Sequence, residues 1–187
     1  MAKFTAARLQ EILARHQPAP QTFVETGTWI GNSTRLALGA FQKVHTIELS
    51  EALFKEHSPG LEAKGAICHH GDTRIELPKL AESIAEPVFW FLDAHWTDQC
   101  AGAVFGPLPL FDELQRLSER TYPDVICVDD VHSFISHRAA ALKERPARAK
   151  LFAENPDWNR VDLPRIASYF PGHREAIIIG DQAVVYR

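Results

Sequence analysis

The chain has 187 residues, 45% hydrophobic and 24% charged, which is typical of a soluble globular protein and suits one domain with a substantial core. The net charge of −4 gives no support for nucleic acid or an anionic membrane as the main partner. No apolar run is long enough to span a bilayer, and the first residues lack the apolar core of a signal peptide. The three cysteines have no metal-type spacing, so we expect reduced thiols in a cytoplasmic protein.

Strand-like and helix-like segments alternate along the chain. Apolar residues at helical spacing predict helices, and short runs rich in apolar and β-branched residues predict strands. The helices are expected over 4–16 and 73–84, from about 32 and 50, and from Pro107 or Pro109. The strands are expected over 22–24, 43–49, 65–69, 87–92 and 124–128, and in a hairpin over 176–186 with a Gly180–Asp181 turn. The run 87–92 is continuously apolar, as in a central strand that is buried on both faces.

This alternation predicts an α/β fold. It indicates a Rossmann-like, doubly wound, mostly parallel sheet of seven strands, with helices on both faces. The C-terminal hairpin places one antiparallel strand at the edge of the sheet. We expect a single domain, 1–187, made of an N-terminal helix (1–19), a cofactor-binding core (20–130), a substrate or lid region (131–170) and the C-terminal hairpin (171–187).

The first strand leads into a glycine-bearing turn and a helix start. Residues 23–34 read FVETGTWIGNST. A helix start offers N–H groups and the positive end of a dipole, and Gly27 lets a ligand approach the backbone, so this is a candidate cofactor site. Trp29 stands where the middle glycine of a dinucleotide fingerprint would be. This argues against a pyrophosphate on the turn, and hence against a nicotinamide oxidoreductase.

Carboxylates follow every one of the first five predicted strands. They are Glu25, Glu48, Asp72, Asp93 and the pair Asp129–Asp130. Ligands of doubly wound sheets bind beyond the carboxyl ends of the strands, so this regularity indicates a site at that edge. Glu48 follows Glu25 at roughly the 20-residue spacing at which an acidic residue reaches ribose hydroxyls. Alternatives remain: Glu25 as a helix-dipole partner, Glu48 as a solvated strand end, and Asp72 as part of a local Gly-Asp turn.

Asp93, Asp129 and Asp130 follow adjacent strands and are candidates to converge. At about 4 Å and an effective dielectric constant of about 20, two like charges repel by about 4 kcal/mol. Three ionised carboxylates therefore need a proton, an Arg or Lys, or a cation, and a hard divalent ion with oxygen ligands is the economical choice. The alternative is that Asp129 and Asp130 point to opposite sides, while Asp93 caps a turn.

Histidines near these carboxylates are candidate bases. His95 has an ordinary pKa of about 6.5 and lies two residues from Asp93, so it could take a hydroxyl proton. His132 is the rival candidate, either as the base or as a fourth ligand of the metal. For both His95 and His132, the alternative is a histidine that is hydrogen bonded in a loop and has no catalytic role. His69 and His70 are adjacent on a strand and are expected to point to opposite faces, which makes them a poor metal pair.

Two motifs resemble those of known enzymes. The Glu-x-Gly-x-x-x-Gly pattern at 25–31 resembles the first motif of class I S-adenosylmethionine-dependent methyltransferases. The Phe-Leu-Asp-Ala-His-Trp run at 91–96, with the acidic pair at 129–130, is similar to metal-dependent O-methyltransferases of bacterial natural-product and polysaccharide clusters. The resemblance covers roughly residues 20–135. It implies S-adenosylmethionine as cofactor, bound by Glu25, Gly27, Thr28, Gly31, Ser33, Glu48, Asp72 and Asp93.

The resemblance also implies a mechanism. Mg²⁺ or another divalent cation would bind to Asp93, Asp129 and Asp130, and His95 and Asp93 would be catalytic in methyl transfer to a hydroxyl of a small molecule. Glu48 would bind the ribose, Asp72 the adenine amino group, and Glu25 would lie by the charged end of the methionine moiety. Several catechol-type enzymes of the family use a lysine near the position of His95. No lysine occurs at 80–142 in this chain, so that variant of the mechanism is not expected.

Two other functions stay open: metal-independent methyl transfer on the same fold, and a non-catalytic cofactor-binding protein. The acceptor is not named by the sequence, and its specificity is expected to reside in 97–106 and 131–170. The edge helix and the hairpin could support a homodimer.

Overall fold

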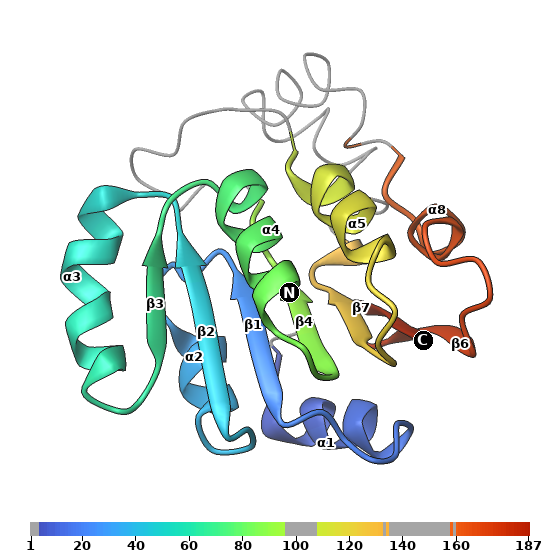
Figure 1. Cartoon of the computed structure of the whole chain (residues 1–187), viewed down its shortest axis with the longest axis horizontal. Coiled ribbons are helices and arrows are strands. Elements are labelled where there is room, and N and C mark those ends of the chain that lie inside the picture. Colours follow the sequence, from blue (N-terminus) through green and yellow to red (C-terminus); the bar gives the residue numbers. More distant parts are fainter. Residues whose placement is uncertain (1–3, 96–107, 133, 135–157, 159) are drawn as a thin grey trace.

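A seven-stranded sheet runs through the middle of the protein (Figure 1), in a computed structural model that describes residues 4–95, 108–132, 134, 158 and 160–187. The strand order is β3-β2-β1-β4-β5-β7-β6, and β1 to β5 are parallel. The strands are β1 (Thr22–Thr26), β2 (Lys43–Glu48), β3 (Ile67–His70), β4 (Val88–Leu92), β5 (Val125–Val128), β6 (Glu175–Ile179) and β7 (Gln182–Tyr186). This confirms the predicted α/β, doubly wound, mostly parallel sheet.

The predicted strands are found with small shifts at their ends. The third strand begins at Ile67 instead of 65, because Gly65 has a φ of 97° and belongs to the preceding turn. The C-terminal hairpin turns at Gly180, whose φ is 65°, as expected. One detail differs: the antiparallel strand β7 lies between β5 and β6, so the edge strand is β6.

Helices cover both faces of the sheet, with α4 and α5 in front of it and α2 behind it in Figure 1. They are α1 (Ala6–Ala14), α2 (Asn32–Ala37), α3 (Glu51–Glu62), α4 (Thr73–Ser83), α5 (Leu110–Ser118) and α8 (Leu163–Ser168). Successive strand residues alternate between the faces. Val24 and Trp90 therefore pack with α4, α5 and α8, whereas Phe23 and Phe89 pack with α1 and α2.

Several predictions concern parts of the chain outside the described residues. These are the specificity loop at 97–106, most of the region 131–170, and Trp96 and Cys100. Within the described part of 131–170, α8 confirms one of the helical pieces expected there. No described helix has the length and apolar character needed to cross a membrane.

Candidate functional site

Hydrogen bonds within the protein hold the turn after β1. The amides of Gly27 and Thr28 donate to the carbonyl of Ile47, at 2.9 and 3.2 Å. The amide of Trp29 donates to Glu48 Oε2 at 2.8 Å. None of these three amides is free to bind a ligand, and the turn instead ties the end of β1 to the end of β2.

The glycines of this turn are required by packing. Gly27 has a φ of 83°, and a Cβ there would lie 2.7 Å from the carbonyl oxygen of Asp93. Gly31 has a φ of 73°, and a Cβ there would lie 2.8 Å from Leu61 Cδ1 of α3. The sequence suggested that Gly27 admits a ligand, but the backbone after β4 occupies that space. The turn therefore lies directly against the segment that carries Asp93.

Glu25 is fully buried beneath the turn. Its carboxylate accepts hydrogen bonds from Ser33 Oγ, from Thr34 Oγ1 at 2.5 Å and from Thr46 Oγ1 at 2.6 Å. Burial raises its pKa to about 7, although these three hydrogen bonds act in the opposite direction. In the structure Glu25 and Ser33 thus join β1 to α2, and the Glu25 side chain has no exposed surface at which a ligand could contact it.

The raised pKa of Glu25 makes a prediction about stability. A carboxyl with a higher pKa in the folded state contributes stability that is fully present below its unfolded pKa, near 4.5, and is lost as pH rises through about 7. We expect the free energy of unfolding to fall over this window, and to fall less steeply in Glu25→Gln. Urea denaturation at a series of pH values measures both slopes.

The matched control for this prediction is Glu62→Gln, a change of an exposed glutamate on α3. This variant should show the same slope of the free energy of unfolding against pH as the wild type. The slope will not vanish in Glu25→Gln, since burial also raises the pKa values of Glu113 and Asp129. Equal slopes for Glu25→Gln and the wild type would show that Glu25 does not titrate in this window.

The next two strand-end acids have different surroundings. Glu48 ends β2, and its Oε1 accepts from the amide of Ser50 at 2.8 Å. Asp72 is the N-cap of α4, where it accepts from the amide of Arg74 at 2.9 Å and pairs with the guanidinium of the same residue at 2.5 Å. Hydrogen bonding to Arg74 lowers the pKa of Asp72. Its carboxylate is therefore engaged locally, which is the alternative that the sequence left open.

The ends of β4 and β5 bring Asp93, His95 and Asp130 together. His95 Nδ1 lies 3.3 Å from Asp93 Oδ1, and His95 Nε2 lies 3.2 Å from Asp130 Oδ2. One possible ligand atom from each residue lies within 4.8 Å of the others. The rings of Phe134 and Trp158 lie beside the imidazole, with centroids at 5.3 and 6.5 Å. The three polar side chains form a compact, largely enclosed group.

Asp129 is held apart from this group. Its Oδ1 accepts from Gln182 Nε2 at 2.6 Å and from the amide of Asp130 at 2.8 Å. Asp130 has a φ of 53°, so the chain turns sharply between the two aspartates. The predicted metal set was Asp93, Asp129 and Asp130; the cluster in the structure has His95 in place of Asp129. Sequence spacing could not reveal Gln182, which lies on β7.

The electrostatics of the cluster favour a protonated imidazole. Burial lowers the pKa of His95, but the hydrogen bond and charge of Asp130 and the charge of Asp93 outweigh it and raise the pKa to about 9. Burial raises the pKa of Asp93, and that of Asp129 to about 6. Burial acts in the same direction on Asp130, but its contact with His95 outweighs this and lowers its pKa. An imidazolium thus supplies the positive charge that neighbouring carboxylates require.

The rival histidine lies elsewhere. The side chain of His132 is 55% exposed, and its Nδ1 lies 3.2 Å from Asp181 Oδ1 in the β6–β7 turn. The amide of His132 also donates to Asp181, at 2.9 Å. His132 therefore contacts the hairpin, and the geometry favours His95 as the histidine that acts with Asp93.

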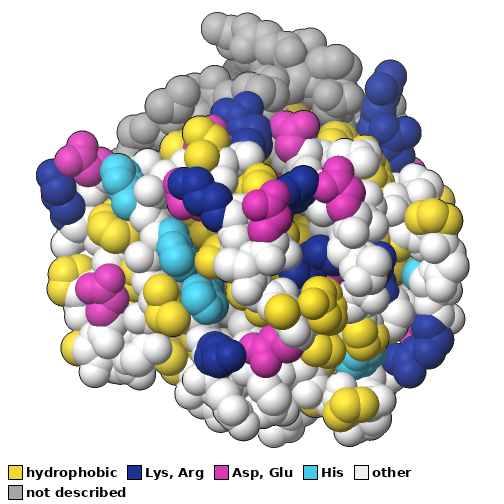
Figure 2. Space-filling model, in the orientation of Figure 1, with side chains coloured by type: hydrophobic (Ala, Val, Ile, Leu, Met, Phe, Trp, Pro, Cys, Tyr) yellow, Lys and Arg dark blue, Asp and Glu magenta, His cyan; other side chains and the backbone are white. Residues whose placement is uncertain are grey.

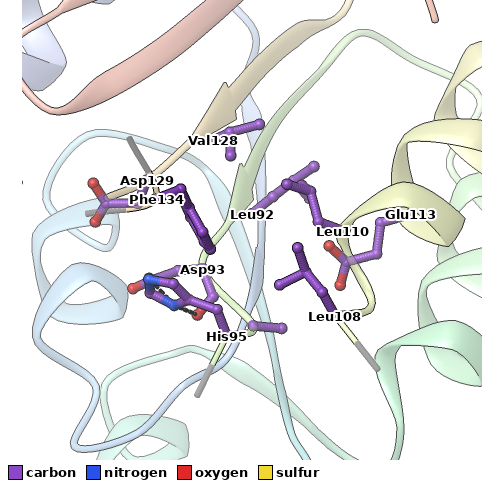
Figure 3. Close-up of a pocket in the computed structure, with 10 residues that line it drawn as sticks. Leu92, Asp93, His95, Leu108, Leu110, Glu113, Val128, Asp129 and Phe134 are labelled. Atoms are coloured by element: carbon purple, nitrogen blue, oxygen red, sulfur yellow. Dashed lines mark hydrogen bonds and ion pairs between the residues drawn. The ribbon is translucent and has the colours of Figure 1, made fainter. Parts of the chain in front are cut away.

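A small hollow lies beside the cluster (Figure 3). It is lined by Leu92, Asp93, Ala94, His95, Leu108, Leu110, Glu113, Val128, Asp129 and Phe134. The sequence did not single out Glu113, which is 2% exposed and whose pKa burial raises to about 7. A signal was present, because Glu113 shares the face of α5 on which Leu110, Leu114 and Leu117 are buried. A charged residue on an apolar helix face is a candidate site residue.

His69 and His70 do point to opposite sides of β3. His69 Nε2 lies 3.1 Å from His45 Nδ1 of β2, whereas the ring of His70 packs on Phe54 of α3 with centroids 5.1 Å apart. Figure 2 shows histidine side chains gathered over β2 and β3. Burial lowers the pKa of His45 to about 4 and also lowers that of His69. Both are therefore neutral at pH 7 and belong to the sheet surface.

Solved structures of O-methyltransferases have the same fold. A structure titled a putative caffeoyl-CoA O-methyltransferase from Staphylococcus aureus matches with a TM-score of 0.63 and 15% identity, over 100% of this chain and 83% of that one. The O-methyltransferase TomG of tomaymycin synthesis from Streptomyces achromogenes, in complex with S-adenosylmethionine, matches with a TM-score of 0.58 and 21% identity, over 98% and 80%.

A third structure, of an O-methyltransferase from Bacillus cereus in complex with S-adenosylhomocysteine, matches with a TM-score of 0.55 and 16% identity, over 100% of this chain and 94% of that one. No protein-family model and no curated relative matches the sequence. At these identities the likeness concerns the fold, which this chain shares with these O-methyltransferase structures.

Proposed function

We propose that this chain, which has the fold of S-adenosylmethionine-dependent O-methyltransferases, transfers the methyl group of S-adenosylmethionine to a hydroxyl of a small molecule. One observation carries the proposal. The turn after β1 packs through Gly27 on the backbone of Asp93, so the expected cofactor turn and the largely enclosed Asp93–His95–Asp130 cluster are contiguous. Methyl transfer needs this adjacency, because nucleophile and methyl group must be held in line.

The surroundings of the turn suit an adenosyl group. Glu48 ends β2, and each of its oxygens keeps a lone pair that can accept a ribose hydroxyl. Trp29, Leu49 and Ile75 are large apolar side chains with exposures of 37%, 52% and 59%. Each lies just beyond the end of β1 or β2 or in the first turn of α4, at the carboxyl edge of the sheet. Apolar surface beside a carboxylate is what a purine ribonucleoside requires.

The cluster has a donor set that fits a divalent cation. Asp93 and Asp130 offer carboxylate oxygens, and His95 offers a nitrogen. Oxygens suit Mg²⁺ or Mn²⁺, whereas an imidazole adds affinity for Mn²⁺, Fe²⁺ or Zn²⁺. A cation bound there would supply Lewis acidity that lowers the pKa of a substrate hydroxyl. The chain itself contributes the enclosed pocket, the orientation of the acceptor and a histidine beside it.

Metal-independent transfer is the second candidate, and the His95 contacts favour it. An imidazolium between Asp93 and Asp130 already balances the carboxylate charge, so the cluster is complete without a cation. In this version a carboxylate–histidine pair takes the hydroxyl proton directly. The two versions differ in their response to chelation.

Calorimetry with S-adenosylhomocysteine tests the cofactor half. We expect saturable binding to the wild type, and binding about tenfold weaker or worse in Glu48→Ala, because two ribose hydrogen bonds are lost. Glu62→Gln is the matched control on exposed α3 and should bind as the wild type does. If millimolar S-adenosylhomocysteine produced no binding heat and no shift in the unfolding temperature, the proposed function would be ruled out.

Chelation tests the metal. If a cation is required, EDTA should abolish turnover, and Mn²⁺ or Mg²⁺ should restore it to the wild type but not to Asp130→Ala. Full turnover after thorough chelation would select the metal-independent version.

A further inference from the structure

Glu113 has a buried oxygen that lacks a partner. Among the described residues, nothing hydrogen bonds to its Oε1, although the side chain is only 2% exposed. Figure 3 shows the carboxyl directed into the hollow, across from His95 and Asp129. An unsatisfied buried acceptor costs about 1–3 kcal/mol, and native proteins keep few of them without a functional reason. A ligand group is a natural partner for this oxygen.

The position of Glu113 indicates which part of a ligand would reach it. Thr73 and Thr26 act on its carboxyl to lower the pKa that burial raises, and Asp72 is a neighbouring charge. Thr26 ends β1 and Thr73 begins α4, so the carboxyl lies between the cofactor turn and the turn after β3. Glu113 lies on the side of the hollow away from His95 (Figure 3). On the proposed function, that side faces the adenine end of the cofactor, and the His95 side faces the methyl group.

The neighbouring acidic residue is less suited to that role. Asp72 caps α4 and is paired through both oxygens with the guanidinium of Arg74. Glu113, by contrast, has an oxygen without such a partner, between the apolar side chains of Leu108 and Leu110. Apolar walls with one well-placed acceptor recognise a flat, neutral ring that carries a donor.

We propose that Glu113 accepts a hydrogen bond from the exocyclic amino group of the cofactor's adenine, the role that the family resemblance gives to Asp72. This rests on the proposed function and adds the residue that selects the base. Above about pH 7, where the Glu113 carboxyl is ionised, a site built to accept from an amino group discriminates against a ring with oxygen at that position, because the buried carboxylate is then unpaired and faces another acceptor.

The test compares two ligands, S-adenosylhomocysteine and S-inosylhomocysteine, in which a carbonyl oxygen replaces the amino group. At about pH 8.5, where the Glu113 carboxyl is ionised, we expect the wild type to bind the adenosyl compound at least tenfold more tightly. In Glu113→Leu this preference should collapse, because affinity for the adenosyl compound falls while affinity for the inosyl compound does not. Leucine suits the apolar walls, and thermal unfolding checks that the variant is folded.

Glu113→Gln provides a second readout. The glutamine side chain can turn its N–H group toward the carbonyl oxygen of the inosyl compound. The preference for the adenosyl compound should therefore become smaller, mainly because the inosyl compound binds more tightly. Asp112→Asn, a change of the adjacent exposed residue on α5, should keep the full preference.

The possible results separate this proposal from the proposed function. A wild type that binds both ligands equally, or a preference that survives in Glu113→Leu, would overturn the role of Glu113 alone. A preference lost in Asp72→Asn and kept in Glu113→Leu would return the role to Asp72. A wild type that binds neither ligand would overturn both proposals.

Discussion

Replacing His95 with alanine is expected to lower the rate of methyl transfer by about 10²- to 10⁴-fold, which is the usual contribution of a general acid or base. His95 lies between Asp93 and Asp130, at 3.3 and 3.2 Å, and borders the hollow beside the ends of β4 and β5. The measurement is the rate of S-adenosylhomocysteine formation with acceptors drawn from a panel of hydroxylated small molecules. An unchanged rate in His95→Ala would exclude it as the base.

His132→Ala is the discriminating variant, because His132 is the rival base. We expect it to retain most of the activity, since its exposed side chain contacts Asp181. A large loss in His132→Ala, with full activity in His95→Ala, would assign the base to His132.

The pH dependence gives an independent readout of the same site. With a pKa of about 9, His95 is protonated at pH 7 and cannot accept a proton until it loses one. Without a cation, the rate should therefore rise with pH toward about 9. Nuclear magnetic resonance of the imidazole nitrogens can follow the titration, and Asp130→Asn should lower the pKa because it removes a negative charge 3.2 Å from the ring. An ordinary pKa in the wild type would contradict this electrostatic account.

Replacing Arg120 with methionine is expected to lower the free energy of unfolding by about 3–5 kcal/mol, the usual cost of removing one partner of a buried ion pair. Arg120 is 6% exposed, and its Nε lies 2.7 Å from Oδ2 of the fully buried Asp124. The variant leaves that carboxylate buried without its counter-charge. Urea denaturation measures the loss.

Further contacts of Arg120 support this expectation. Its guanidinium lies over the ring of Trp90 of β4, with 5.2 Å to the centroid. It also donates to three backbone carbonyls, those of Ala81, Ile84 and Glu86. The single side chain thus joins the end of α4 to the starts of β4 and β5, at the opposite edge of the sheet from the site.

Arg116→Met is the matched control, because Arg116 lies in the last turn of α5, four residues before Arg120. Its ion pairs with Glu82 and Glu119 are at the surface, where such pairs contribute about 0–1 kcal/mol. We expect a correspondingly small loss of stability. If Arg116→Met and Arg120→Met lowered the free energy of unfolding by similar amounts, burial of the Arg120–Asp124 ion pair would add nothing to stability.

Local residue patterns were enough to predict the architecture. The continuously apolar run that became β4, the helical spacing of α1 and α5, and the Gly180–Asp181 turn each reflect short-range physics, in which periodicity selects helix or strand and turn residues end it. The order of these elements implied a doubly wound sheet. Its carboxyl edge was then the expected place for a site.

The partners of each carboxylate could be known only from the tertiary structure. Glu25 and Asp93 both follow the strand-end pattern, yet Glu25 is bound by Ser33 and Thr34 whereas Asp93 meets His95. Gln182 of β7 holds Asp129 away from the cluster.

The sequence by itself determined the fold class, and it predicted a site at the carboxyl edge of the sheet together with the acidic and histidine residues expected there. The tertiary structure alone decided that His95 joins Asp93 and Asp130, and that Glu113 borders the same hollow. The physical reason is that backbone pattern depends on near neighbours. The direction and ionisation of a buried side chain depend instead on groups that are distant in the chain and close in space.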